Sequence, residues 1–297
     1  MLLPKFDYHQ PRDLPAACGL LAELGPEARV IAGGTDLLVN LKHGRIRPKA
    51  LVGLERLEEL TGLDSGRGRL FIGARTSAAH LAASRSLGGG LRLLAQAAGQ
   101  LGSPQVRNRA TIGGNLCTAR PAAELPPPLL CLDARALLAG PQGQREVALS
   151  AFFKGPGLTV LGPDEIMRGV VIPRPGLGGG GAYLKLGLRR AMEISLVNVA
   201  AFLQLAPDGR TIAQARVALG AVAPTPILSP RAAQALIGQR AGDKLFAAAA
   251  EAAARDARPI DDHRGSAAYR RDMVRVLARR ALEQAWDQAR GRRGGKS

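Results

Sequence analysis

The sequence is short of aromatic residues and of long apolar runs, and each shortage excludes a class of function. Aromatic residues make up only 3% of the 297 residues, which argues against a module that binds nucleic acid by base stacking. No apolar run approaches the ~18 residues that span a bilayer, so we expect no membrane span. The N-terminal segment is interrupted by Lys5 and Asp7, so we expect no signal peptide and a cytoplasmic protein.

Metal-binding patterns are missing as well. The three cysteines, Cys18, Cys117 and Cys131, are widely separated and too few to supply the thiolates of a usual iron–sulfur cluster. The histidines are isolated from one another and form no zinc-ligand spacing. We therefore predict no metal site within this chain.

Positive charge, in contrast, is abundant, with a formal net charge of +17. Such a chain can bind nucleic acid or an anionic membrane surface. Here the charge is spread along the chain, and its one dense cluster is the C-terminal RGRRGGKS. Arginines in RRDMVRVLARR alternate with apolar residues at helical spacing, as on a solvated helix face. We favour a solvated basic surface, or an acidic protein partner, over nucleic acid.

The length and the 46% of hydrophobic residues predict two or three packed units. Near the N-terminus we expect a helix, PAACGLLAEL capped by Asp13, and then a strand, ARVIAGG. The next unit combines helices in TSAAHLAAS and GLRLLAQAAGQL with strands in LFIGA, ATIGG, ARALLAG, REVALS and MRGVVI.

PRPGLGGGG, residues 173–181, is typical of a flexible linker. Strands are expected beyond it in AYLKLGLR, LVNVAAFLQLA and ARVALGAVA, and then two helices. The last helix is predicted to bury a stripe of Tyr269, Met273, Val276, Leu277 and Leu282. Strands followed by helices indicate an α+β terminal unit.

Two glycine turns are the strongest chemical signal, AGGTD from Ala32 to Asp36 and TIGGN from Thr111 to Asn115. Adjacent glycines allow positive φ and close approach to a ligand, and successive N–H groups can form a nest for phosphate oxygens. Together the turns could hold a pyrophosphate without a helix dipole or a lysine; separately, each could be a plain tight turn. The glycines at 176, 178 and 181 also satisfy GxGxxG, but a strand-like segment follows them, which excludes a Rossmann turn.

AGGTDLL and TIGGNLC, with LGSPQVRNRA before the second, resemble the flavin-binding subunit of molybdenum hydroxylases. That family includes the medium subunits of carbon monoxide dehydrogenase and 4-hydroxybenzoyl-CoA reductase and the middle portion of xanthine dehydrogenase. The resemblance covers nearly the whole chain, because IGARTSAAHL, PDEIMRGVVIP, AYLKLGLRRAMEISLVNVA and SAAYRRDMVRVLARRAL follow in family order.

The resemblance implies an α+β protein with an FAD-binding fold of the vanillyl-alcohol-oxidase-like type in residues 1–175. This domain has α+β subdomains of about 1–55 and 56–175. A flavoprotein C-terminal domain with an antiparallel sheet and helices is expected in residues 182–290. By position in the family motifs, the FAD-binding residues are Ile31, Ala32, Gly33, Gly34, Thr35, Asp36, Leu37, Leu101, Thr111, Ile112, Gly113, Gly114, Asn115, Thr118, Glu124, Met167, Lys185 and Ile194.

Roles within this set also follow from the resemblance. Leu101 and Met167 match positions at the adenosine end of FAD, and Ile194 a residue that covers the isoalloxazine ring. Thr118 and Glu124 match polar contacts to FAD, and Lys185 matches a lysine near the cofactor. The alternatives are ordinary surface positions for Glu124 and Lys185 and an ordinary core position for Ile194. No catalytic side chain is implied.

The implied activity is electron transfer within a multi-subunit oxidoreductase. Substrate is oxidised at a molybdopterin centre on a large subunit, and electrons cross two [2Fe–2S] clusters of a small subunit to the FAD. They then leave to NAD, quinone, ferredoxin or oxygen, in a dimer of heterotrimers. TARPAAELPPPLLCLDA lacks the cysteine-rich insert of the 4-hydroxybenzoyl-CoA reductase subunit, which argues against its [4Fe–4S] variant. The alternatives are a stand-alone flavin oxidoreductase of the same fold and a basic, non-enzymatic binding protein.

Overall fold

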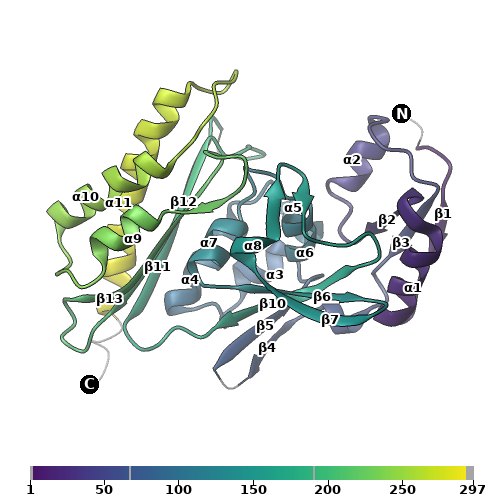
Figure 1. The fold of residues 1–297 in the computed structure, drawn as a ribbon, viewed down its shortest axis with the longest axis horizontal. Helices are drawn as coiled ribbons and strands as arrows, with labels where there is room; N and C mark the ends of the chain where they lie inside the picture. The colour runs from purple at the N-terminus through teal and green to yellow at the C-terminus, as the bar shows by residue number, and fades with distance from the viewer. Residues whose placement is uncertain (1–2, 67, 190, 292–297) are drawn as a thin grey trace.

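A computed structural model describes residues 3–66, 68–189 and 191–291. The basic cluster predicted at the C-terminus lies, from residue 292 onward, outside the described residues. The chain forms three units in a row, with the N-terminal unit and the long C-terminal helices at opposite ends (Figure 1). The predicted α+β class is confirmed, since helices pack on separate, largely antiparallel sheets.

The N-terminal unit is a parallel sheet of order β1-β3-β2 with one packed helix. Its elements are β1 (Asp7–His9), α1 (Leu14–Leu24), η1 (Gly25–Glu27), β2 (Ala28–Ile31), α2 (Leu37–Lys42) and β3 (Ala50–Gly53). The Asp13 side chain accepts a hydrogen bond from the N–H of Ala16 at 2.8 Å, so the predicted N-cap is confirmed. β2 ends where AGGTD begins, so the sheet sets the position of the first glycine loop.

The middle unit is an antiparallel sheet of order β4-β5-β10-β6-β7 with short helices. Its elements are η2 (Glu58–Leu60), β4 (Leu63–Gly66), β5 (Arg69–Gly73), α3 (Ala78–Ala83), η3 (Gly89–Leu91), α4 (Arg92–Gly99), α5 (Pro104–Arg109), α6 (Ile112–Cys117), α7 (Pro126–Cys131), β6 (Arg135–Gly140), β7 (Gly143–Ala148), α8 (Leu149–Phe152), β8 (Phe153–Gly155), β9 (Leu158–Thr159) and β10 (Ile166–Pro173).

The C-terminal unit is an antiparallel sheet of order β11-β12-β13-β14 between two helical layers. Its elements are β11 (Gly179–Leu186), β12 (Val197–Leu205), β13 (Ile212–Gly220), β14 (Ile227–Leu228), α9 (Pro230–Leu236), α10 (Asp243–Asp256) and α11 (Ala267–Gly291). Helices α9, α10 and α11 cover one face, while α4 and α7 of the middle unit pack on the other (Figure 1). Tyr183 and Phe202 of this sheet belong to the same hydrophobic core as Leu93 and Leu129 of those two helices.

The prediction that the glycine-rich residues 173–181 form a flexible linker is partly wrong. Gly179, Gly180 and Gly181 are buried residues of strand β11, paired with β12. A Cβ on Gly180 would lie 2.1 Å from the carbonyl oxygen of Ala285, so this glycine lets α11 pack directly on the sheet. The strand after the GxGxxG pattern is confirmed.

Two further predictions about local structure are wrong. ATIGG was expected to be a strand, but Ile112–Cys117 is helix α6, with Thr111 as its N-cap. The predicted stripe of α11 includes Tyr269 and Val276, which are exposed. The buried face is shifted because alanines, including Ala278 and Ala285, allow close contact with β11 and β12.

Candidate functional site

One large cavity lies where the three units meet. Its volume is about 1160 Å³, above the usual range of about 300–1,000 Å³ for small-molecule sites. Every predicted cofactor residue except Ile112 and Lys185 lines it. The structure therefore brings together segments from the N-terminal unit, the middle unit and the C-terminal unit that are far apart in the sequence.

The first glycine loop presents free backbone donors to this cavity. Gly34 has φ +74°, a conformation that side chains other than glycine rarely adopt. Among the described residues, no acceptor contacts the N–H groups of Gly33, Gly34, Thr35 and Asp36. Successive free N–H groups around a left-handed residue are suited to bind phosphate oxygens.

The second glycine loop is arranged differently, because its N–H groups already have acceptors within the chain. Those of Ile112 and Gly113 donate to Thr76 and Ala74 of the segment after β5, at 3.0 and 2.8 Å. The N–H of Gly114 donates to the Thr111 hydroxyl at 3.1 Å. The expectation of a nest of free N–H groups here is therefore wrong, since the residues begin helix α6.

Packing explains the remaining glycines of the two loops. A Cβ on Gly33 would lie 1.9 Å from the carbonyl oxygen of Arg109, so the first loop touches the backbone that leads into the second. A Cβ on Gly113 would lie 2.7 Å from the Cβ of Ala74. Gly114 is exposed to the cavity and has no positive φ. The two loops are neighbours, and their glycines serve mainly close approach.

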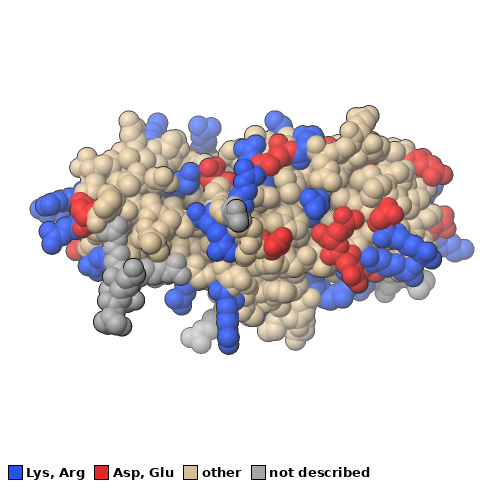
Figure 2. Space-filling view, turned by 90° about the horizontal axis from the view of Figure 1, so that it is seen from below, with Lys and Arg blue, Asp and Glu red and all other residues tan. Residues whose placement is uncertain are grey.

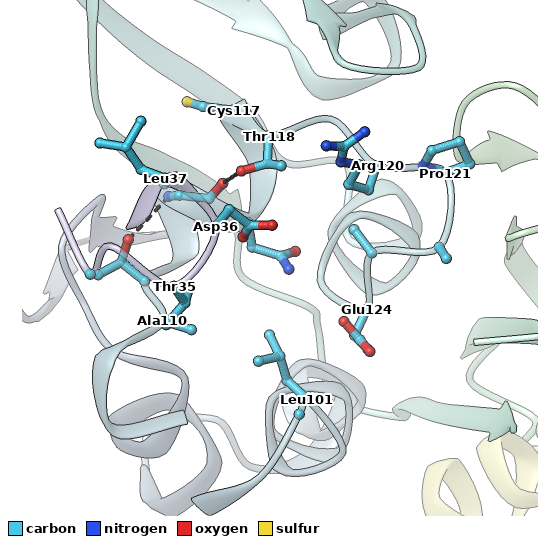
Figure 3. A pocket seen from close by; sticks show the side chains of 18 of the residues that line it. Thr35, Asp36, Leu37, Leu101, Ala110, Cys117, Thr118, Arg120, Pro121 and Glu124 are labelled. Atoms are coloured by element: carbon cyan, nitrogen blue, oxygen red, sulfur yellow. Dashed lines mark hydrogen bonds between the residues drawn. The ribbon is translucent and has the colours of Figure 1, made fainter. Parts of the chain in front are cut away.

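The second loop contributes side chains instead. The Asn115 Oδ1 accepts from the N–H of Leu125 at 3.4 Å, which leaves the amide N–H₂ group as a donor. Thr118 lines the cavity beside it and donates its hydroxyl hydrogen to the Gly114 carbonyl at 2.7 Å (Figure 3). The polar groups of the second loop facing the cavity are thus an amide and a hydroxyl oxygen.

Lys185 and Glu124 form a buried ion pair beside the cavity. The Lys185 Nζ lies 2.8 Å from the Glu124 Oε1, with the two side chains 7% and 10% exposed. The same ammonium donates to the carbonyls of Glu193 at 2.8 Å and Gln100 at 3.2 Å. Burial raises the pKa of Glu124, while the charge of Lys185 opposes that rise. Lys185 therefore links three segments of the cavity wall and does not face the cavity itself.

Apolar side chains form the other walls. Leu101 and Met167 are buried residues of the middle unit that line the cavity. Met192, Ile194 and Ile260 also line it, but each is more than half exposed. Ile194 is therefore not a core residue, and the apolar wall on the side of the C-terminal unit reaches the surface.

A carboxylate and a cation near the first loop complete the polar lining. Burial raises the pKa of Asp36, and the nearby charge of Arg120 opposes the rise. The Asp36 charge also contributes to raising the pKa of Glu124. All three side chains surround the same space in Figure 3. Arg120 was missed in the sequence because nothing in TARPAAE distinguishes it from a surface arginine.

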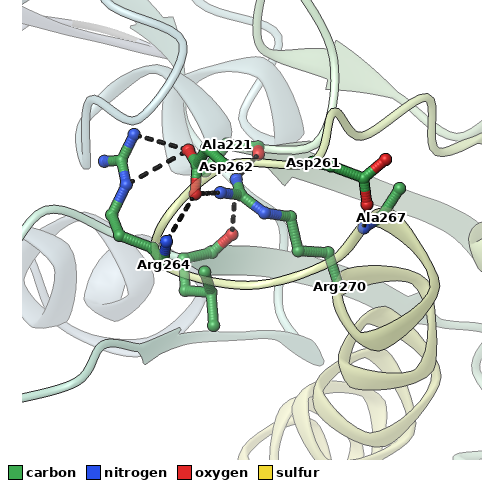
Figure 4. Close-up of polar contacts among 7 residues, drawn as sticks. Ala221, Asp261, Asp262, Arg264, Ala267 and Arg270 are labelled. Carbon is green, nitrogen blue, oxygen red and sulfur yellow. Dashed lines mark hydrogen bonds and ion pairs between the residues drawn. The ribbon is translucent and has the colours of Figure 1, made fainter.

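A second missed feature is a network around Asp262 in the segment between α10 and α11 (Figure 4). Its carboxylate accepts from Arg264 at 2.8 Å and lies 2.6 Å from the Nη2 of buried Arg270. Burial would raise the pKa of Asp262, but hydrogen bonds from both arginines outweigh it and hold the pKa well below its usual range. Arg270 also donates to the Ala221 carbonyl at 3.1 Å. The network fixes the wall of the cavity on the C-terminal side.

Comparisons with known proteins agree with this arrangement. The family described as FAD binding domain in molybdopterin dehydrogenase matches residues 4–175, and the CO dehydrogenase flavoprotein C-terminal domain matches residues 182–285. The carbon monoxide dehydrogenase medium chain of Hydrogenophaga pseudoflava is 35% identical over 96% of this chain and 99% of its own length. The chain belongs to the family of FAD-binding subunits of molybdenum hydroxylases.

Other relatives and solved structures extend the match. The putative xanthine dehydrogenase FAD-binding subunit of Escherichia coli is 33% identical over 96% of this chain and 97% of its own length. The structure of the Hydrogenophaga pseudoflava carbon monoxide dehydrogenase superposes with a TM-score of 0.93, covering 97% of this chain and 99% of that one. The structure of quinoline 2-oxidoreductase of Pseudomonas putida 86 superposes with a TM-score of 0.91 at 30% sequence identity. The match covers 98% of this chain and 100% of that one. The protein is thus an oxidoreductase subunit with an FAD-binding domain.

The residues present fit FAD on structural grounds. The cavity crosses three units, its inner wall at the first loop has free N–H donors, and its outer wall is apolar and open. Within the described part of the chain, no three His, Cys, Asp or Glu residues gather where they could hold a metal ion. In the same residues, no helix is both long enough and apolar enough to cross a membrane.

Proposed function

We propose that this chain is the FAD-carrying electron-transfer subunit of a multi-subunit molybdopterin hydroxylase. It passes electrons from [2Fe–2S] clusters of a small partner subunit to an external acceptor, while substrate is oxidised at molybdopterin on a large subunit. The observation that supports this most directly is the single cavity that joins both glycine motifs to an exposed apolar wall. The proposal includes a dimer of heterotrimers in the cytoplasm and the domains 1–175 and 182–290.

The residues of the chain bind and orient the cofactor. The N–H groups of residues 33–36 and the amide of Asn115 are placed to hold phosphate and ribityl oxygens, while Leu101 and Met167 supply apolar contacts. Ile194, which is 57% exposed, would cover a ring near the surface. When bound, FAD supplies the redox chemistry, and the protein controls its position and electrostatics. A ring near the surface suits electron exchange with other proteins.

The distribution of charge fits this proposal better than nucleic-acid binding. In the view of Figure 2, Lys and Arg side chains are scattered over the face with Asp and Glu side chains between them. An interspersed surface of net positive charge suits docking to acidic partner proteins. The acceptor could then be NAD, quinone, ferredoxin or oxygen, as the family resemblance implies.

Purification of the complex through a tag on this chain tests the proposal. We expect a large and a small partner to copurify, with molybdenum, iron and FAD, and we expect the isolated FAD-loaded chain not to turn over any substrate of the complex. Turnover by the isolated chain would instead favour the stand-alone flavin oxidoreductase. A colourless chain that binds nucleic acid in a salt-sensitive manner would favour the basic binding protein.

A further inference from the structure

Arg120 is a cavity-lining cation that forms no ion pair with any carboxylate among the described residues. Its side chain is exposed to the cavity and, across residues 3–66, 68–189 and 191–291, it has no hydrogen-bond acceptor and no carboxylate at ion-pair distance. Arg264 and Arg270, which also line the cavity, are both bound to Asp262. Arg29 donates to the carbonyls of Pro26 and Ala28, whereas the cavity-lining Arg45 and Arg258, like Arg120, have no side-chain hydrogen bond or ion pair among the described residues. Arg120 therefore retains all its donors for a ligand.

The backbone that carries Arg120 is held in a specific and unusual conformation. Ala119 has φ 47°, a left-handed conformation that costs a residue with a Cβ on the order of 1 kcal/mol. Three backbone hydrogen bonds fix this turn, from Gly157 to the Ala119 carbonyl at 2.9 Å, from Ala123 to the Arg120 carbonyl at 3.0 Å, and from Ala221 to the Pro121 carbonyl at 2.7 Å. Segments of the middle and C-terminal units thus hold the turn in place.

Arg120 lines the same cavity as the free donors of the first glycine loop. Its charge opposes the rise in the pKa of Asp36, although the two side chains form no ion pair. Asp36 follows directly after Gly34 and Thr35, whose N–H groups have no acceptor among the described residues. Figure 3 shows Arg120 and Asp36 at the same end of the cavity. A guanidinium and a row of N–H groups form a charge-assisted site for a phosphate group.

We infer that Arg120 binds a phosphate oxygen of the dinucleotide and so distinguishes FAD from a flavin without phosphate. The inference rests on the proposed function, since it concerns the same cavity. It adds to the site a charged residue that neither glycine motif contains. It also accounts for the open, fixed conformation of the Ala119–Arg120 turn, which no intramolecular contact of the Arg120 side chain requires.

Flavin titration of the purified chain tests this role. Dissociation constants of FAD and of riboflavin, which has no phosphate, are measured for the wild type, Arg120→Met and Arg120→Lys at low and high salt. Arg92→Met is the matched control, because Arg92 is an exposed arginine outside the cavity. Circular dichroism checks that each variant is folded.

We expect Arg120→Met to weaken FAD binding about ten- to hundredfold, the range for a hydrogen bond to a charged group. Riboflavin binding should not change, the salt dependence of FAD binding should fall, and Arg120→Lys should retain part of the affinity. Equal losses for FAD and riboflavin, or no loss for FAD, would overturn the inference. If the wild type binds no FAD at all, the proposed function fails instead.

Discussion

The buried ion pair between Lys185 and Glu124 allows a quantitative test of the cavity wall. Replacing Lys185 by Met removes the cation 2.8 Å from the Glu124 carboxylate and two hydrogen bonds to backbone carbonyls. Removing one partner of a buried pair costs about 3–5 kcal/mol of the free energy of unfolding. Because both side chains are at most 10% exposed, solvent screens the pair little and the full range applies.

The destabilisation should depend on pH in a defined direction. Burial already raises the pKa of Glu124 above its unfolded value, and loss of Lys185 raises it further. A folded state with a raised carboxyl pKa binds the proton more tightly than the unfolded state. The loss of stability in Lys185→Met is therefore complete above that raised pKa and becomes smaller as the pH falls towards the unfolded value of about 4.5.

Urea unfolding of the flavin-free chain, followed by circular dichroism at about pH 8 and pH 5.5, measures this effect. Lys49→Met is the control, since Lys49 pairs with Glu27 on the surface, at 75% and 55% exposure, and should cost less than about 1 kcal/mol. The double variant Lys185→Met/Glu124→Gln should recover part of the loss. The reasoning is refuted if Lys185→Met costs no more than Lys49→Met, or if its cost is equal at both pH values.

Five further outcomes are expected. The purified chain should release about one FAD and no FMN on denaturation, as checked by chromatography of the extracted flavin, and elemental analysis should find no stoichiometric iron, molybdenum or zinc in it. Gly33→Ala should weaken FAD binding at least tenfold while circular dichroism stays native, because its Cβ would meet the Arg109 carbonyl at 1.9 Å and displace the loop. Gly34→Ala should cost about 1 kcal/mol in urea unfolding, because φ at this position is +74°. The Cys117 side chain is partly exposed at the cavity, but burial raises the pKa of its thiol to about 12, so iodoacetamide at pH 8 should label Cys117 more slowly in the folded than in the unfolded chain.

Elements with a strong local pattern could be predicted from the sequence. The helix after Asp13, the apolar strands of the C-terminal sheet and the alanine-rich α10 are all present. ATIGG could not be assigned locally, because its apolar residues and glycines are compatible with a strand. Its helical start depends on the Thr111 cap and on hydrogen bonds to Ala74 and Thr76, which are distant in sequence.

Contacts between residues distant in sequence also limit how much of the candidate site could be predicted. The glycine motifs identified two walls of the cavity, since they are contiguous in the chain. The Asp262–Arg270 network depends on contacts between distant segments of the C-terminal unit, and the position of Arg120 depends on a backbone hydrogen bond between units, from Ala221 to the Pro121 carbonyl. Lys185 was predicted near the cofactor; its ammonium is bound by three acceptors, one of them the cavity-lining Glu124, so its charge is already partnered within the chain. Only a folded structure distinguishes an available cation from one that is already bound.

The structure also changes which substitutions can test binding. Gly33 and Gly113 are each required where backbone segments touch, at Arg109 and at Ala74, whether or not a cofactor is present. A larger residue at either position displaces the backbone, so a loss of flavin in Gly33→Ala reports on the position of the loop and not on a contact of the new side chain with the ligand. A Cβ on Gly114 would meet only the Thr111 hydroxyl, at 3.0 Å, and the Arg120 side chain has no hydrogen bond or ion pair among the described residues. These two positions face the cavity without supporting the fold, and substitutions there report on the ligand directly.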